Sequence, residues 1–256
     1  MSDDRDPLIV EAPRAEQHSG DQPGVPTSRK TQRWIQPFKK DSLPPWPCPR
    51  CNTGTLSLRK GSMLEVSSGD TAAIPDYDFD TDFYEGRFTC VADCSRPGCG
   101  ETVIVTGRSF VESENDDGSH YVTLLTPVCV HPPPPIVPLP PRCPKDVRSE
   151  LVSAFGLYWM DLRAAANRVR TSVELLLTRL GIQRVWIRES KRRRLTTHER
   201  IELFRAKDSE LGSSLLAIKW IGNEGSHPGD LKKQDLLDAF ELISHVLDET
   251  YAKRST

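Results

Sequence analysis

The spacing of apolar residues changes character about halfway along the chain. Three short runs before residue 130 are dense in Val, Thr, Ile and Tyr, which is typical of β-strands. These runs are FTCVADC (88–94), ETVIVTG (101–107) and HYVTLLTPV (120–128). We therefore expect a small β-rich module in the first half of the chain.

The second half has the period of amphipathic helices. From Val147 to Leu180 apolar residues recur every three or four positions, which predicts one long helix with Gly181 as its C-cap. A second helix in LTTHERIELF begins with Thr196 or Thr197 as its N-cap. SELGSSLLAIKWI predicts a third helix, which ends at Gly222. KKQDLLDAFELISHVLDETY predicts a fourth, with an apolar stripe of Leu236, Phe240, Ile243, Leu247 and Tyr251.

The composition along the chain predicts four parts. Residues 1–30 are polar and aperiodic, which predicts a disordered tail. Residues 34–130 carry most of the cysteines and the strand-like runs, whereas HPPPPIVPLPPRCP (131–144) is typical of a polyproline linker. Residues 145–254 form the helical part, an all-α bundle of about four helices.

Overall charge and hydropathy argue against a generic polyanion-binding protein and against a membrane-spanning protein. The net charge is −2, so any affinity for a polyanion has to come from a local patch. No apolar run approaches the roughly 18–20 residues of a membrane span, and the acidic N-terminus lacks the features of a signal peptide. We therefore expect a cytoplasmic protein with no membrane partner.

The cysteines predict a metal site. CPRC, with Cys48 and Cys51, has the spacing at which two thiolates chelate one ion. Seven cysteines in a reducing compartment favour metal or free thiols over disulfides. We predict structural Zn²⁺, which commonly takes four such ligands. The alternative is a set of unrelated buried thiols, which a CPxC motif followed by a Cys/Gly turn disfavours.

The second ligand pair lies in CVADCSRPGCGE. We choose Cys94 and Cys99, because the intervening SRPG contains a turn and Gly100 supplies the small residue that amide–sulfur hydrogen bonds need. Cys90 then lies in the preceding strand and stays the reserve candidate. Such a closed site would stabilise a small module that has little core of its own.

A basic run precedes the second predicted C-terminal helix, in what we expect to be a loop. It is IRESKRRRLTTHER, and its candidate nucleic-acid-binding residues are Arg188, Lys191, Arg192, Arg193 and Arg194. The alternative is a solvated loop, since charge runs usually are that.

Four C-terminal segments resemble one known family. AANRVRTSVELLL, LTTHERIELF, LLAIKWIGNEGSHPGD and LLDAFELISHVLDETY look like the family called domain of unknown function 4145, over about the last 110 residues. That family is grouped with the HEPN-like four-helix proteins of prokaryotic toxin and defence systems. The resemblance implies a HEPN-like bundle, RNA as a partner and a homodimer formed through the helices. The expected fold class is therefore α+β in two modules, a small β-rich zinc ribbon followed by an all-α HEPN-like four-helix bundle.

The resemblance also implies a candidate catalytic site. HEPN ribonucleases cleave RNA without metal, using a His and an Arg that lies a few residues before it. This chain has His227, with Asn223 four residues before it, but Lys219 is the nearest preceding cation. In a ribonuclease, His227 would act as general acid or base, and Lys219 or a distant Arg168 or Arg170 would hold the phosphate.

The alternative to catalysis is a structural lock. Gly222 would end the helix, Asn223 would take a left-handed turn, and His227 would bond a carbonyl or Glu174. The missing Arg favours the lock, because it is the group that would stabilise charge in the transition state. We therefore predict a zinc-containing binding module for nucleic acid or a protein partner. The alternatives are a metal-independent ribonuclease that uses His227 and a scaffolding or antitoxin-like subunit.

Overall fold

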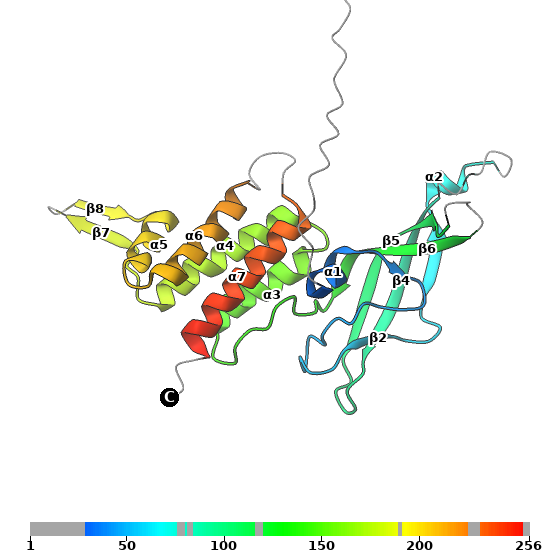
Figure 1. The fold of residues 1–256 in the computed structure, drawn as a ribbon, viewed down its shortest axis with the longest axis horizontal. Helices are drawn as coiled ribbons and strands as arrows, with labels where there is room; N and C mark the ends of the chain where they lie inside the picture. The colour runs from blue at the N-terminus through cyan, green and yellow to red at the C-terminus, as the bar shows by residue number, and fades with distance from the viewer. Residues whose placement is uncertain are drawn as a thin grey trace, which may run out of the picture.

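The computed structural model describes residues 29–75, 80, 84–115, 120–188, 191–224 and 231–252. The predicted tail lies outside these residues, except for its last two. The described chain forms two lobes, a curled β-sheet and a group of packed helices, with helix α1 (Arg29–Ile35) beside the junction (Figure 1).

The sheet has six strands, and every pairing in it is antiparallel. Their order is β1 (Phe38–Lys39), β6 (Tyr121–His131), β5 (Thr102–Ser113), β4 (Glu85–Cys94) and β2 (Leu56–Leu58), with β3 (Leu64–Ser67) also paired to β4. The short helix α2 (Gly69–Ala72) follows β3. Burial alternates along β4, where Phe88, Cys90 and Ala92 face the core. The three strands predicted from sequence are confirmed.

A bulge bends the two longest strands. The pairing of β5 with β6 shifts register between Thr106 and Gly107. A Cβ atom at Gly107 would lie 2.1 Å from the carbonyl oxygen of Thr126, so only glycine allows the backbones to approach this closely.

The second lobe contains five helices among the described residues. They are α3 (Lys145–Leu157), α4 (Leu162–Arg179), α5 (Thr197–Arg205), α6 (Ser209–Glu224) and α7 (Lys233–Tyr251). The apolar faces of α4 and α7 carry most of the buried residues, as expected for amphipathic helices.

The single long helix predicted from Val147 to Leu180 is wrong. The chain turns at residues 158–161, and α3 and α4 pack against each other. Asp161 N-caps α4, because its carboxylate accepts a hydrogen bond from the Ala164 amide at 2.9 Å. Tyr158 and Trp159 are buried within the turn, so the apolar period continues where the helix does not.

The predicted helix ends have mixed outcomes. Thr196 is the N-cap of α5 and forms a capping box with Glu199, and Gly181 follows α4 with a φ of 72°. The N-cap at Thr196 is confirmed, whereas the C-cap of α4 is Leu180 and Gly181 lies one residue beyond it. Gly222 does not end its helix, since α6 continues to Glu224.

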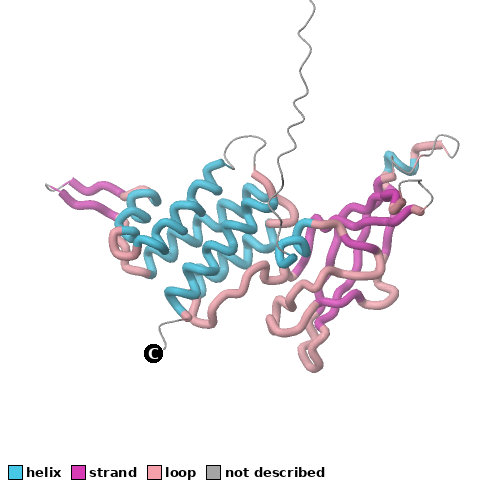
Figure 2. Tube along the Cα trace, viewed as in Figure 1, coloured by secondary structure: helices cyan, strands magenta, loops and turns pink. Residues whose placement is uncertain are grey.

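The predicted fold class is also wrong. The second module is not an all-α four-helix bundle, because strands β7 (Val185–Arg188) and β8 (Lys191–Arg194) pair there as an antiparallel hairpin. The hairpin lies at the end of the molecule opposite to the sheet (Figures 1 and 2). The first module is a six-stranded sheet rather than a small ribbon, because β4, β5 and β6 pair over most of their length. The fold therefore mixes α and β structure in both lobes.

Aromatic side chains join the two lobes. Trp46 from the β lobe lies with its ring centroid 5.1 Å from that of Trp159, which follows α3. On the side of the sheet, the ring centroid of Phe38 lies 5.8 Å from that of Trp46. On the side of α7, the ring centroid of Tyr158 lies 5.2 Å from that of Trp159. One core cluster therefore spans the sheet and the helices.

The proline-rich segment packs against this junction. Ile136 and Val137 are buried, and the Ser244 hydroxyl of α7 donates to the Pro138 carbonyl at 2.9 Å. In the part of the chain described, no helix has both the length and the apolar character needed to cross a membrane.

Candidate functional site

Four cysteines from two loops meet at one end of the sheet. Cys48 and Cys51 lie in the turn that leads into β2, whereas Cys94 ends β4 and Cys99 lies in the turn after it. The pairing of Leu56 with Cys94 places the two loops beside each other. The strands thus bring together residues that lie more than forty positions apart in sequence.

The sulfur atoms have the spacing of a tetrahedral metal site. All four lie within 4.8 Å of one another. Cys48 Sγ lies 3.8 Å from Cys99 Sγ, and Cys51 Sγ lies 3.7 Å from Cys94 Sγ. Zinc–sulfur bonds of about 2.3 Å imply tetrahedral edges of about 3.8 Å. The four thiols are therefore placed to hold one metal ion.

Backbone groups support the cluster. The amide of Gly54 donates to Cys51 Sγ at 3.3 Å, and the amide of Arg96 donates to Cys94 Sγ at 3.4 Å. The Arg50 guanidinium donates to the Cys99 carbonyl at 2.8 Å and so ties the first loop to the second. Such contacts around the ligands orient the sulfurs.

The two cysteines of CPRC differ in their acidity. Hydrogen bonds from the backbone of Thr53 and Gly54 lower the pKa of Cys51 to about 5. Burial raises the pKa of Cys48 to about 12, because a thiolate is poorly solvated there. Metal ions bind the thiolate, so a bound cation would supply the stabilisation that Cys48 lacks.

The other cysteines lie away from this cluster. Cys90 is buried in the core face of β4, where burial raises its pKa to about 11. Cys129 lies in β6, and Cys143 is buried at the end of the proline-rich segment. Cys94 and Cys99, rather than Cys90, therefore complete the cluster. The contributions of Gly54 and Arg50 were missed, because nothing in their local sequence marks them.

The basic run forms the β7–β8 hairpin rather than the predicted loop. Arg192, Arg193 and Arg194 are exposed on β8. They pair in register with Ile187, Trp186 and Val185 of β7. Arg188 pairs with Lys191 as the last pair of the two strands, so all five predicted basic residues lie on one narrow arm.

Two apolar side chains of this arm are exposed to solvent. Trp186 is 42% exposed and Ile187 is 73% exposed. Arg193 anchors the arm, since its guanidinium donates twice to the Glu199 carboxylate, at 2.7 and 3.1 Å. This pairing, with the cap hydrogen bonds, lowers the pKa of Glu199 to about 2.

The structure does not place the predicted catalytic residues together, because one of them lies outside the described residues. His227 lies outside the described residues, and the backbone of Asn223 belongs to α6. Lys219 Nζ lies 4.3 Å from the ring centroid of Trp220, which is itself exposed. Glu174, considered as a partner of His227, accepts a hydrogen bond from the Thr197 hydroxyl at 2.5 Å.

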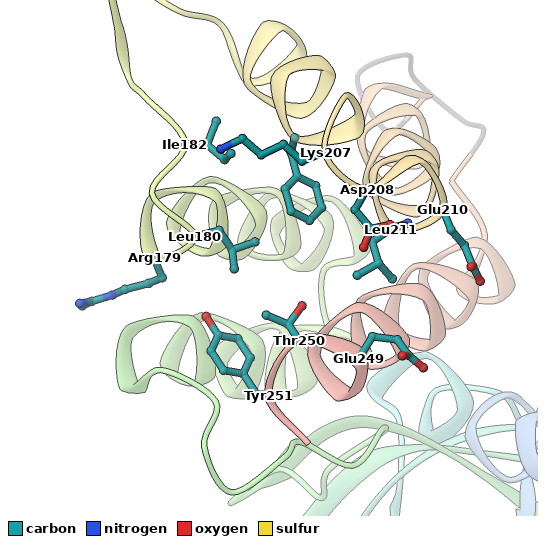
Figure 3. A pocket seen from close by; sticks show the side chains of 11 residues that line it. Arg179, Leu180, Ile182, Lys207, Asp208, Glu210, Leu211, Glu249, Thr250 and Tyr251 are labelled. Atoms are coloured by element: carbon teal, nitrogen blue, oxygen red, sulfur yellow. Dashed lines mark hydrogen bonds between the residues drawn. The ribbon is translucent and has the colours of Figure 1, made fainter. Parts of the chain in front are cut away.

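A cavity of about 730 Å³ opens at one end of the helical lobe. Side chains from α4, α7 and the α5–α6 connection face one another across it (Figure 3). Its apolar wall includes Leu180 and Leu211, whereas Lys207, Glu210 and Glu249 give its rim charges of both signs. This mixture of charges indicates no particular ligand.

Comparison with known proteins identifies two family models along the chain. The model described as domain of unknown function (DUF4145) matches residues 152–255, and another described as domain of unknown function (DUF8608) matches residues 36–127. The first match confirms the resemblance seen in the C-terminal segments. No curated protein and no solved structure matches the chain. The two matches correspond to the helical lobe and to most of the sheet.

Proposed function

We propose that this protein binds single-stranded nucleic acid, such as RNA, through the β7–β8 arm, and that Zn²⁺ in the cysteine cluster stabilises the β lobe. The observation that carries the proposal is the exposed Trp186 on a strand paired with a strand of basic residues. Aromatic rings stack on bases and cations contact phosphates, which together are typical of single-strand recognition.

The register of the hairpin places Trp186 on one face of the arm, and Arg192 and Arg194 on the other. Side chains of directly paired residues share a face, so Trp186 lies with Arg193, and Ile187 lies with Arg192. Because Arg193 donates to the Glu199 carboxylate of α5, the part of the arm that carries Trp186 is tied to that helix. Arg192 and Arg194 on the opposite face remain exposed for phosphate contacts.

Zinc is the metal that the cluster favours. Four thiolates in a tetrahedral arrangement suit Zn²⁺ and disfavour hard cations such as Mg²⁺ and Ca²⁺. Such a site has no open position, so its role is to hold the loops around the short strand β2. The proposed setting is a prokaryotic defence or toxin-type system.

Fluorescence anisotropy with a labelled single-stranded RNA tests the arm. The double variant Arg192→Gln/Arg194→Gln should bind more weakly and reduce the slope of log K against log salt by about 1.4, since each phosphate contact on a single strand contributes about 0.7. Trp186→Ala should weaken binding about tenfold without changing that slope.

A matched charge loss on the sheet provides the control. Arg87→Gln/Arg108→Gln removes two exposed arginines from the opposite lobe and should leave RNA binding unchanged. Equal losses in both double variants would contradict the proposal. Electrophoresis of the RNA after incubation reports cleavage in the same experiment, and a His227→Ala variant would show whether the ribonuclease alternative applies.

Metal analysis of the purified protein tests the zinc site. The wild type should contain one equivalent of Zn²⁺, and Cys94→Ser should lose it, because three thiolates bind far more weakly than four. Cys129→Ser is the control, since Cys129 lies in β6 outside the cluster. Full zinc content in Cys94→Ser would contradict the assignment.

A further inference from the structure

Three arginines gather in a pocket at the base of the β7–β8 arm. The pocket has a volume of about 350 Å³ and is lined by Arg184, Arg194 and Arg200, together with residues at the start of α5 and Glu174. Arg184 precedes β7 and Arg194 ends β8. The Leu195 amide donates to the Arg184 carbonyl at 2.9 Å, which holds the two ends of the hairpin together.

Arg200 forms the inner wall of this pocket. Its side chain comes from α5 and is only 5% exposed. Its terminal nitrogens donate to the Glu174 and Ile182 carbonyls, at 3.1 and 3.2 Å, and to the Thr178 hydroxyl at 2.9 Å. Among the described residues its buried Nε finds no acceptor. A buried donor without a partner is costly, and a ligand oxygen would relieve that cost.

The charges in the pocket do not balance. Burial and the nearby Arg184 and Arg194 lower the pKa of Arg200, whereas Glu174 opposes them. The Glu174 carboxylate accepts from the Thr197 hydroxyl, and no ion pair joins a carboxylate to Arg184 or Arg194 within the described parts of the chain. Three guanidinium groups against one carboxylate leave a net charge of +2.

Two further features suit an anion. The pocket lies at the N-terminus of α5, where the helix dipole favours negative charge, although the capping box already uses the amide and the carboxylate of Glu199. Its volume lies at the lower end of the range for small-ligand sites, roughly 300–1,000 Å³. A phosphate monoester carries up to two negative charges and three acceptor oxygens, which match the charge and the donors of this pocket.

We propose that this pocket binds a terminal phosphate, the phosphoryl group of a phosphate monoester. The group would be either the phosphorylated end of a nucleic-acid strand or that of a free nucleotide. Arg184 and Arg194 contact it from the hairpin, and Arg200 contacts it through Nε. The idea that a nucleic-acid strand end supplies the phosphate rests on the proposed function, whereas the proposal that the pocket binds a phosphate does not.

Calorimetric titration with AMP and with adenosine tests the pocket on the full chain. AMP should bind and adenosine should not, because only AMP carries the phosphate. Arg184→Gln should weaken AMP binding about tenfold or more, as expected for a lost charge-assisted hydrogen bond. Arg184 is exposed, so this variant should fold normally.

Arg205→Gln is the matched control. It removes an exposed arginine from the same lobe, at the end of α5 and outside the pocket lining, and should leave AMP binding unchanged. Equal responses to AMP and adenosine, or AMP binding that is unchanged in Arg184→Gln, would overturn the proposal.

Anisotropy with two otherwise identical RNAs identifies the source of the phosphate. A strand with a 5′-phosphate should bind about tenfold more tightly than one with a 5′-hydroxyl, and Arg184→Gln should abolish that preference. If AMP binds while the two strands bind equally, the ligand is a free nucleotide. If neither strand binds, the proposed function fails, and the AMP titration still decides the pocket.

Discussion

Gly54 lies so close to Cys94 that a side chain at this position would displace the Cys94 sulfur from the cysteine cluster. A Cβ atom on Gly54 would lie 2.5 Å from Cys94 Sγ. The same residue donates its amide to Cys51 Sγ. Gly54 therefore contacts one cysteine from each of the two loops, although its sequence context does not mark it.

If the cluster holds zinc as proposed, we expect Gly54→Ala to weaken zinc binding about 10- to 100-fold, the range seen when residues next to metal ligands are changed. Competition with a chromogenic chelator would measure the affinity. Gly69→Ala is the control, because a Cβ atom there meets no other atom within 4 Å. Equal affinities in the two variants would show that the spacing around Cys94 does not limit the site.

Acid should release the anchor of the β7–β8 arm at an unusually low pH. The pKa of Glu199 is lowered from 4.5 to about 2 by Arg193 and by the helix cap. Its contribution to stability is therefore complete above about pH 4.5 and is lost as the pH falls toward 2. Carbon-detected NMR of the Glu199 carboxyl should report this low pKa, and Arg193→Gln should raise it. An ordinary pKa in the wild type would contradict the ion pair.

At the scale of elements, the turn between α3 and α4 depends on one cap. Asp161 supplies the only side-chain bond described for the N-terminus of α4, to Ala164. We expect Asp161→Ala to destabilise the protein by about 1 kcal/mol, as measured by chemical denaturation. Asp161→Asn retains an acceptor and should cost much less. Similar losses in both variants would show that charge, rather than capping, is what α4 requires.

The elements that sequence reasoning located are those with a local signal. Strands β4 to β6 follow from β-branched composition, and Thr196 follows from the capping-box pattern with Glu199. The hairpin was missed because β8 consists entirely of basic residues, so it lacks the alternation of apolar and polar residues that is typical of a strand. The break after α3 was missed because Tyr158 and Trp159 keep the apolar period through a turn.

At the scale of the whole molecule, the aromatic junction couples the two lobes. Trp159 contacts both Trp34 and Trp46, at centroid distances of 6.0 and 5.1 Å. Trp46 precedes Cys48 of the cysteine cluster by two residues, so the cluster and the helices are supported by the same aromatic side chains. If the cluster holds the proposed zinc, its removal should therefore destabilise the helical lobe as well as the β lobe.

We expect calorimetry of the zinc-loaded protein to show one cooperative unfolding transition. Trp159→Ala should cost about 3–5 kcal/mol and split this transition into two, because the lobes would lose their common core. The control is Trp186→Ala, which removes an exposed tryptophan from the arm and should keep a single transition. Two transitions in the wild type would contradict the coupling.

The sequence by itself determined what short-range chemistry controls. Chelating spacing in CPRC, alternation in the strands and capping at Thr196 all act within a few residues, and each can be read locally. The tertiary structure alone decided which contacts join distant segments. The Tyr158 hydroxyl reaches the Trp34 carbonyl across 124 positions, and Arg184, Arg194 and Arg200 converge only because the base of the hairpin lies at the start of α5. Packing of this kind depends on the whole fold, so no local pattern records it.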